Sequence, residues 1–146
     1  MKIQLIGFID ELPEATKNIV LKAVEDTKNN TGMVLTFALN YGSRAEIIEA
    51  TKAISTLVKQ DELEIENIDD VVFESHLQTH FLGDLQNPDL MIRTSGEVRL
   101  SNFLLWQLAY SEYYFTDIFW PDFSEKDLHK AIQTYQNRHR RYGGLA

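Results

Sequence analysis

Short apolar runs alternate along this chain with longer stretches in which apolar residues recur every three or four positions. Runs of strand length lie at residues 2–8, 33–39 and 90–92, and a short extended piece is expected within 113–120. Stretches with helical spacing follow Pro13, Ser43 and Ser124, and a shorter one lies within 68–80. Strands that alternate with helices predict an α/β fold with a mainly parallel sheet flanked by helices and joined by right-handed crossovers.

The predicted helices each have one apolar face and recognisable ends. Pro13 suits the start of the first helix, and Ser43 with Glu46 has the spacing of a capping box for the second. Ser124 with Asp127 is expected to cap the last helix, which should reach to about residue 140. The residues expected to face inward are Ala15, Ile19, Val20, Ala23 and Val24 in the first helix and Ile47, Ile48, Thr51, Ile54, Leu57 and Val58 in the second.

The stretch 88–112 combines a short strand, a glycine turn and a run from Phe103 to Tyr110 that is apolar nearly all round. We expect that run to be a buried helix, covered by the rest of the domain or by a second copy of the chain, which argues for an oligomer. Arg93 ends the strand, and Arg99 and Ser101 precede the helix. Two guanidinium groups, a hydroxyl and a helix N-terminus suit an oxyanion, above all a phosphate or diphosphate. The other interpretation is that the arginines form surface salt bridges and the serine only caps the helix.

The composition is that of an ordinary globular domain, and we expect residues 1–146 to form a single one. Hydrophobic residues make up 44% of the chain, which is enough for a core. The formal net charge of −8 disfavours nucleic acid as a partner, so any anion must be held by a local basic cluster. The chain has no cysteine, which excludes disulfides and thiolate metal sites and fits a cytoplasmic protein. No apolar stretch approaches the roughly 20 residues of a membrane-spanning helix, so no membrane span is expected.

The sequence PDLMIRTSGEVRLSNFLLWQLAYSEYYF at residues 88–115, followed by WPDF at 120–123, resembles the C-terminal signature of the cis-prenyltransferases, the family of undecaprenyl diphosphate synthase and isoprenyl transferase. The similarity extends to LNYGSRAEI at residues 39–47 and to RRYGG at residues 140–144. The family's N-terminal motif, HxxxMDGNxRW with its catalytic aspartate, has no counterpart here. The resemblance therefore implies a truncated fold of this family, in which residues 1–146 correspond to the middle and C-terminal part and the catalytic residue is unknown.

The resemblance implies a transferase that condenses isopentenyl diphosphate with an allylic prenyl diphosphate to make a polyprenyl diphosphate. Arg93, Arg99 and Ser101 would bind the diphosphate of isopentenyl diphosphate, and Glu112 would help to hold Mg²⁺. Arg141 and Gly143 would belong to a tail that reaches across a homodimer toward the neighbouring active site. Without the resemblance, Glu112 is only an exposed charge, and the basic residues around Arg141 complement the end of a helix.

Three hypotheses about activity remain open at this point. In the first, the chain is an isoprenyl transferase that retains the isopentenyl diphosphate half-site and is completed by an N-terminal half from another polypeptide. In the second, it is a non-catalytic accessory subunit or an inactive fragment of such an enzyme, and in the third it is an unrelated phosphate-binding module.

The expected partners are the two diphosphates, together with a second copy or a chain carrying the N-terminal half. The expected location is the cytoplasm, with a peripheral position at the membrane as a variant. Without the first strand of the family's fold, a sheet edge and apolar helix faces should lie uncovered.

Overall fold

The computed structural model describes residues 1–138 and has the α/β character that the sequence predicts. The chain divides into two compact units, Met1–Gly83 and Asp84–Ala146, and each is described by itself. The elements of the first unit are β1 (Lys2–Ile6), α1 (Glu14–Thr27), β2 (Val34–Ala38), α2 (Ser43–Lys59) and α3 (Asp70–Ser75). Those of the second unit are β3 (Leu90–Arg93), β4 (Glu112–Phe115) and α4 (Glu125–Gln136). Single turns of 3₁₀ helix lie at Ile9–Glu11, Ile65–Asn67 and Trp120–Asp122, and His80–Leu85 contains two such turns separated by a kink at Gly83.

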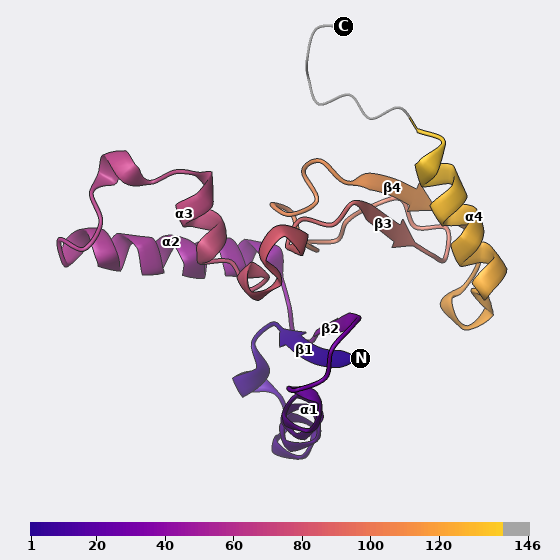
Figure 1. Cartoon of the computed structure of the whole chain (residues 1–146), viewed down its shortest axis with the longest axis horizontal. Coiled ribbons are helices and arrows are strands. Elements are labelled where there is room, and N and C mark those ends of the chain that lie inside the picture. The colour runs from indigo at the N-terminus through magenta and orange to yellow at the C-terminus, as the bar shows by residue number, and fades with distance from the viewer. Residues whose placement is uncertain (139–146) are drawn as a thin grey trace, which may run out of the picture. The chain divides into compact units, whose positions relative to one another are not determined.

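In the first unit, β1 and β2 pair in parallel, with Lys2 opposite Val34 and Ile6 opposite Ala38. The helix α1 connects the two strands and packs on β1 (Figure 1). The hydroxyl of Thr27, at the last turn of α1, accepts a hydrogen bond of 3.0 Å from the backbone N–H of Ile3. This bond ties the end of the crossover helix to the strand that it covers.

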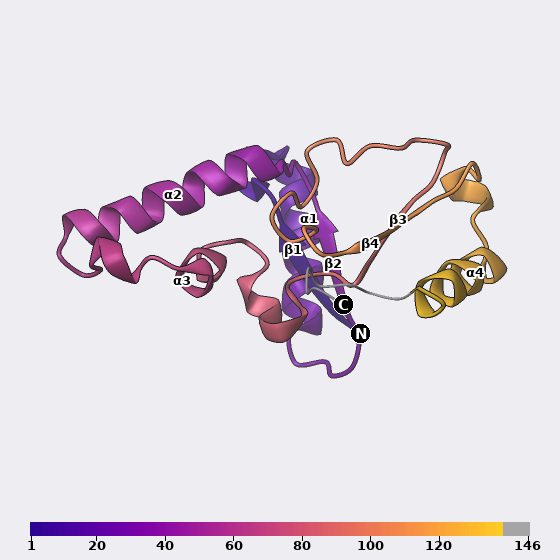
Figure 2. The same ribbon diagram turned by 90° about the horizontal axis from the view of Figure 1, so that it is seen from above.

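The helix faces of this unit differ in part from the prediction. Ile19 is 70% exposed, and Ala15, Ile48 and Thr51 are exposed as well. In α2 the buried positions are Ser43, Glu46, Ala50 and Ile54, which lie three and four residues apart. The helix packs along α3, as Figures 1 and 2 show from two directions. The apolar residues on the other flank have no element against them within the described part of this unit, which is why the predicted stripe is only half buried.

A buried carboxylate joins the ends of β1 and β2. The predicted capping box of α2 is wrong, because the N-cap is Gly42 and the backbone N–H of Glu46 donates to the Gly42 carbonyl. The Glu46 side chain, only 1% exposed, accepts hydrogen bonds from the Tyr41 hydroxyl at 2.5 Å and from the Gln78 N–H at 2.8 Å. The Gln78 side chain in turn accepts from the N–H of Gly7, the residue after β1. Three loops at the carboxyl ends of the strands are thereby held together.

In the second unit, β3 and β4 form a second parallel pair, with Leu90 opposite Glu112 and Arg93 opposite Phe115. The helix α4 packs against β4. Its N-terminus carries the predicted capping box, in which the side chains of Ser124 and Asp127 bond reciprocally with the backbone. The long sequence between the strands runs as a series of loops and turns at the carboxyl end of β3.

The predicted buried helix at Phe103–Tyr110 is wrong. Ser101, Asn102 and Leu104 have positive φ angles of 51°, 63° and 45°, which a right-handed helix does not allow. The region contains isolated turns instead, of which the bond from Leu108 N–H to the Leu104 carbonyl is one. Leu104 and Leu108 are buried, whereas Phe103, Leu105 and Tyr110 remain exposed, Tyr110 by 77%. The expected cover from another part of the domain is therefore absent from the described residues of this unit.

Candidate functional site

A tight loop follows Arg93 at the carboxyl end of β3. Ser95 and Gly96 both have positive φ, of 69° and 71°, and so reverse the chain directly after the strand. Their N–H groups donate to the carbonyls of Ile118 and Thr116 at 2.9 Å each, which fixes the loop to the segment after β4. In a parallel sheet this edge, at the carboxyl ends of the strands, is where ligands bind.

The structure brings the three predicted ligand residues together around the guanidinium group of Arg93. Its Nη1 donates to the backbone carbonyl of Arg99 and to the hydroxyl of Ser101, the latter at 3.2 Å. The positive φ of Ser101 turns the chain back toward the strand at this point. Because one donor nitrogen is anchored internally, the Arg93 side chain is oriented in advance for an anion.

Arg99 is more exposed and is paired with a neighbour. Its Nη1 forms an ion pair with the carboxylate of Glu97 within the same loop. Both side chains remain accessible to solvent, so the pair is worth little by itself. An incoming phosphate can take over the Arg99 guanidinium without a large penalty, since Glu97 can return to water.

A hollow of about 210 Å³ opens beside this cluster. It is lined by Met91, Ile92, Arg93, Arg99, Leu100 and Phe103. Two guanidinium groups therefore stand at a partly apolar wall. Such a combination suits a small molecule with an anionic group and a short hydrocarbon part.

Glu112 does not lie at this cluster. It is the first residue of β4 and lies opposite Leu90, three residues before Arg93, which corresponds to about 10 Å along the strands. Successive residues of a strand point to opposite faces, so Glu112 and Arg93 also lie on opposite faces of the pair. The Glu112 carboxylate accepts a hydrogen bond of 2.5 Å from Nη1 of Arg138, just after α4. The sequence shows the presence of Glu112 and Arg93 but not the register between β3 and β4, which places them apart.

No group of three or more potential metal ligands occurs among residues 1–138. The predicted tail residues Arg141 and Gly143 lie outside the described residues. No helix within the described range is both long and apolar enough to cross a membrane.

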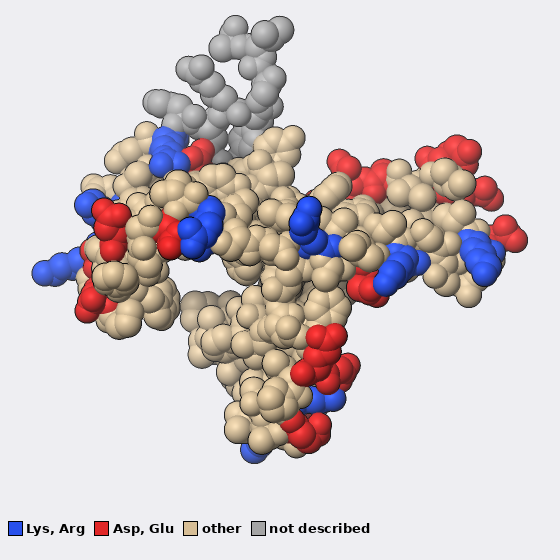
Figure 3. Space-filling view, turned by 180° about the vertical axis from the view of Figure 1, so that it is seen from behind, with Lys and Arg blue, Asp and Glu red and all other residues tan. Residues whose placement is uncertain are grey.

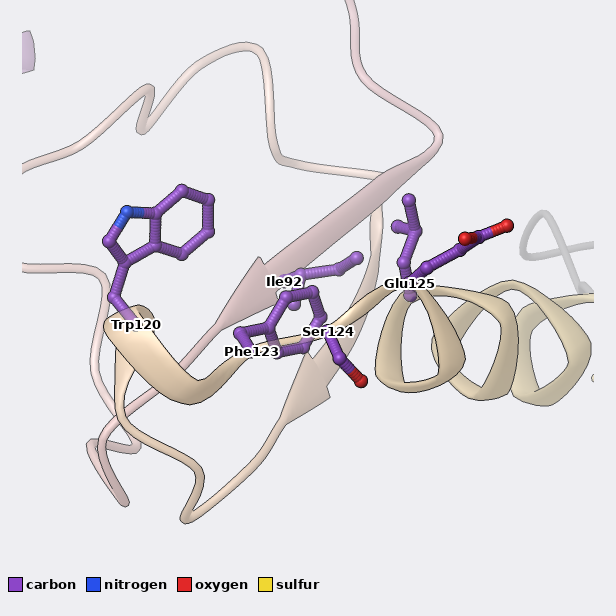
Figure 4. A pocket seen from close by; sticks show the side chains of 6 residues that line it. Ile92, Trp120, Phe123, Ser124 and Glu125 are labelled. Carbon is purple, nitrogen blue, oxygen red and sulfur yellow. The ribbon is translucent and has the colours of Figure 1, made fainter.

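A second and larger hollow, of about 420 Å³, lies between β3 and the start of α4. Figure 4 shows the rings of Trp120 and Phe123 at this hollow, with Ile92 of β3 behind Phe123 and Glu125 at the first turn of α4. The side chain of Ile92 points to the face opposite to that of Arg93. Ile92 lines this apolar hollow and also the smaller hollow beside the arginine cluster.

Comparison with known proteins identifies the family of the chain. Residues 1–143 match the model of a family described as putative undecaprenyl diphosphate synthase. The chain is 54% identical over 145 residues to an isoprenyl transferase of Halalkalibacterium halodurans, covering 99% of this chain and 56% of the relative. It is 53% identical to a (2E,6E)-farnesyl-diphosphate-specific ditrans,polycis-undecaprenyl-diphosphate synthase of Micrococcus luteus, covering 99% of this chain and 57% of that protein.

Solved structures give the same result for the fold. Lavandulyl diphosphate synthase from Lavandula x intermedia, in complex with dimethylallyl diphosphate, is similar with a TM-score of 0.94 and 40% sequence identity, over 98% of this chain and 60% of that one. A probable undecaprenyl diphosphate synthase from Campylobacter jejuni is similar with a TM-score of 0.80 and 30% identity, over 98% of this chain and 63% of that one. The chain thus spans little more than half the length of its relatives and has a truncated form of their fold. By its sequence and its fold, it belongs to the undecaprenyl diphosphate synthase family of prenyltransferases.

Proposed function

We propose that this chain is the part of an isoprenyl transferase that binds isopentenyl diphosphate, for condensation with an allylic prenyl diphosphate into a polyprenyl diphosphate. The observation that carries the proposal is the cluster of Arg93, Arg99 and Ser101 at the carboxyl edge of β3, beside a small, partly apolar hollow. A planar guanidinium offers parallel donors to two phosphate oxygens, which suits a diphosphate better than an ammonium group does. The apolar wall at Phe103 and Leu100 suits a five-carbon hydrocarbon group.

The proposed reaction breaks the carbon–oxygen bond of the allylic diphosphate, so that pyrophosphate leaves. A carbon–carbon bond then forms between the allylic carbon and the alkene of isopentenyl diphosphate, which loses a proton to give the new double bond. The residues described here contribute orientation: they hold the diphosphate of the acceptor so that its alkene is placed for attack. The first strand and phosphate loop that serve the allylic diphosphate in the resembling family have no counterpart in this sequence.

Mg²⁺ is the metal that we propose for the complete site, where it would neutralise charge on the leaving pyrophosphate. Residues 1–138 do not fit it by themselves. A Mg²⁺ ion usually needs one or two carboxylates together with substrate phosphates, yet Glu112 lies away from Arg93 and is bonded to Arg138. Glu112 as a ligand stays a prediction, and the remaining ligands must come from outside residues 1–138.

The partner proposed for this half-site is a polypeptide that supplies the allylic diphosphate half, or a second copy of the chain in a homodimer to which Arg141 and Gly143 contribute. The proposed location is the cytoplasm or the cytoplasmic surface of the membrane. The chain covers 56–60% of the length of these relatives.

The test is a calorimetric titration of the purified chain with isopentenyl diphosphate, repeated with Arg93→Ala. A charged hydrogen bond of about 1.5–3 kcal/mol corresponds to a loss of affinity of roughly 10- to 100-fold. Arg138→Ala is the matched control, because it removes an arginine of the same unit outside the cluster. Equal affinity of the native chain and Arg93→Ala would overturn the proposal.

Incorporation of labelled isopentenyl diphosphate into butanol-extractable product, with farnesyl diphosphate and Mg²⁺ present, separates binding from turnover. Binding without product is expected for the chain alone. Product that disappears in Arg93→Ala would show an enzyme that is active as it stands.

A further inference from the structure

The two arginines of the candidate site differ in what they contact. Nη1 of Arg93 donates to two neutral groups, the backbone carbonyl of Arg99 and the hydroxyl of Ser101. Nη1 of Arg99 instead forms an ion pair with the carboxylate of Glu97, two residues earlier in the same loop. The contacts of Arg93 therefore orient its charge, whereas the contact of Arg99 with Glu97 neutralises a charge that an anion would use.

The backbone at both ends of this ion pair is fixed. The residue before Glu97 is Gly96, whose N–H donates to the carbonyl of Thr116 at 2.9 Å. At the other end, the carbonyl of Arg99 accepts the hydrogen bond from Arg93. The two side chains themselves are accessible, by 38% for Glu97 and by 62% for Arg99. The carboxylate can thus turn into solvent and return to the same guanidinium while the loop backbone stays in place.

The charge of the whole chain makes a single carboxylate in this loop important. The formal net charge is −8, and on the face of the molecule shown in Figure 3 the basic side chains are scattered singly and form no broad patch. An anion therefore depends on the arginines of the loop itself. A carboxylate beside them competes for one guanidinium and also repels the charge of the anion.

We propose that Glu97 is an internal competitor of the bound diphosphate: it pairs with Arg99 before the diphosphate binds, gives way to it, and returns to favour its release. The proposal rests on the proposed function, to which it adds a residue that limits how tightly the diphosphate is held. In the proposed condensation the allylic diphosphate leaves as pyrophosphate, so the product keeps the diphosphate of the isopentenyl unit. That diphosphate must leave the arginines before another unit can bind, and the return of Glu97 to Arg99 favours this step.

Two other roles of Glu97 predict the opposite effect of removing its charge. If the carboxylate oriented Arg99 toward the anion, its loss would weaken binding. If it held Mg²⁺ on the diphosphate, its loss would weaken binding whenever the metal is present. The loss of a competitor instead tightens binding with and without Mg²⁺. Because exposed ion pairs are weak, the expected gain in affinity is about threefold to fivefold.

The experiment is a calorimetric titration of the purified full chain with pyrophosphate, and separately with isopentenyl diphosphate, each without and with Mg²⁺. Glu97→Gln should lower the Kd by the factor just given, and stopped-flow competition should show slower dissociation. Glu125→Gln is the matched control, because it removes the same charge from a side chain that is 84% exposed at the first turn of α4; a change of less than twofold is expected. In the Arg99→Ala background Glu97→Gln should also change the Kd less than twofold, because the arginine for which Glu97 competes is gone.

An unchanged or raised Kd for pyrophosphate in Glu97→Gln, without or with Mg²⁺, would overturn this proposal, and so would an equal gain in the Arg99→Ala background. The proposed function is judged in the same titrations by Arg93→Ala. If Arg93→Ala weakens the binding of isopentenyl diphosphate but Glu97→Gln does not strengthen that of pyrophosphate, only the competitor role is wrong. If Glu97→Gln strengthens the binding of pyrophosphate but Arg93→Ala leaves that of isopentenyl diphosphate unchanged, only the ligand assignment is wrong.

Discussion

Replacing Gly7 by alanine should destabilise the first unit more than the same change at Gly32 or Gly83. Gly7 follows β1 with a φ of +115°, which side chains of L-residues rarely adopt. A Cβ atom there would lie 1.8 Å from the carbonyl oxygen of Leu39 and 2.8 Å from its carbonyl carbon. Ordinary contacts between carbon and oxygen are no shorter than about 3.3 Å. The backbone of one of the two loops must therefore move.

The expected magnitude has two parts. A strained backbone conformation costs on the order of 1–3 kcal/mol, and forced overpacking costs a further ~1–3 kcal/mol. The sum, about 4 kcal/mol at its centre, is a large share of the roughly 5–15 kcal/mol that stabilise a domain. Gly32→Ala is the matched control, because its φ is +89° but no atom lies within 4 Å of the added Cβ. Gly32→Ala should therefore reduce stability only by the cost of the strained backbone conformation.

The assay is urea unfolding of the full chain followed by circular dichroism, with amide exchange at Leu39 as the local readout. The Leu39 N–H donates to the Ile6 carbonyl at 2.9 Å, so it reports on the pairing of β1 with β2 next to the substitution. With a urea dependence of about 2 kcal/mol per molar, Gly7→Ala should lower the midpoint by roughly 2 M. A midpoint no lower than that of Gly32→Ala would refute the steric argument.

Three other perturbations test the remaining contacts. Glu46→Gln should lower the free energy of unfolding by about 1–3 kcal/mol, because an amide nitrogen cannot accept a hydrogen bond from the Tyr41 hydroxyl or the Gln78 N–H. The measurement is urea unfolding, and an unchanged midpoint would contradict a stabilising role for these bonds. A double-mutant cycle of Arg138→Met with Glu112→Gln should give a coupling energy of about 0.5 kcal/mol that falls with added salt, since the ion pair is partly exposed. A coupling energy of several kcal/mol that does not depend on salt would contradict this expectation. The hydroxyl and the N–H of Ser124 donate hydrogen bonds to Asp127 and lower the pKa of its carboxyl. The stabilisation of α4 by these bonds is therefore present above the ordinary pKa of about 3.9 and is lost as the pH falls through the lowered pKa. Ser124→Ala should reduce this acid dependence, which is measured from the helical circular dichroism signal during an acid titration.

The sequence predicted the strands well because each is a short apolar run next to a turn, and it predicted the last helix because Ser124 and Asp127 are a local capping pair. It failed where tertiary structure decides. Nothing local shows that Ser101 and Leu104 take positive φ, so the apolar run after them was interpreted as a helix. Ile19 was expected to be buried on its spacing alone, but burial also requires a neighbouring layer.

The candidate site shows the same division. The grouping of Arg93 with Ser101 follows from a strand that ends in a tight loop, which glycine and serine signal in the sequence. The separation of Glu112 depends on the register between β3 and β4, which no short-range pattern specifies. The Glu46 network was missed for a similar reason: its partner Gln78 lies 32 residues away.

The opposite orientation of Ile92 and Arg93 has a thermodynamic consequence. A slip of β3 by one residue would exchange the faces of the two side chains and turn the guanidinium of Arg93 away from Ser101. Whatever fixes the register of this four-residue strand therefore also fixes the affinity for the anion. By linkage the effect is reciprocal: an anion that binds only the native register stabilises that register by the same factor by which the register raises the affinity for the anion. A strand this short thus couples the local fold to the binding of an anion.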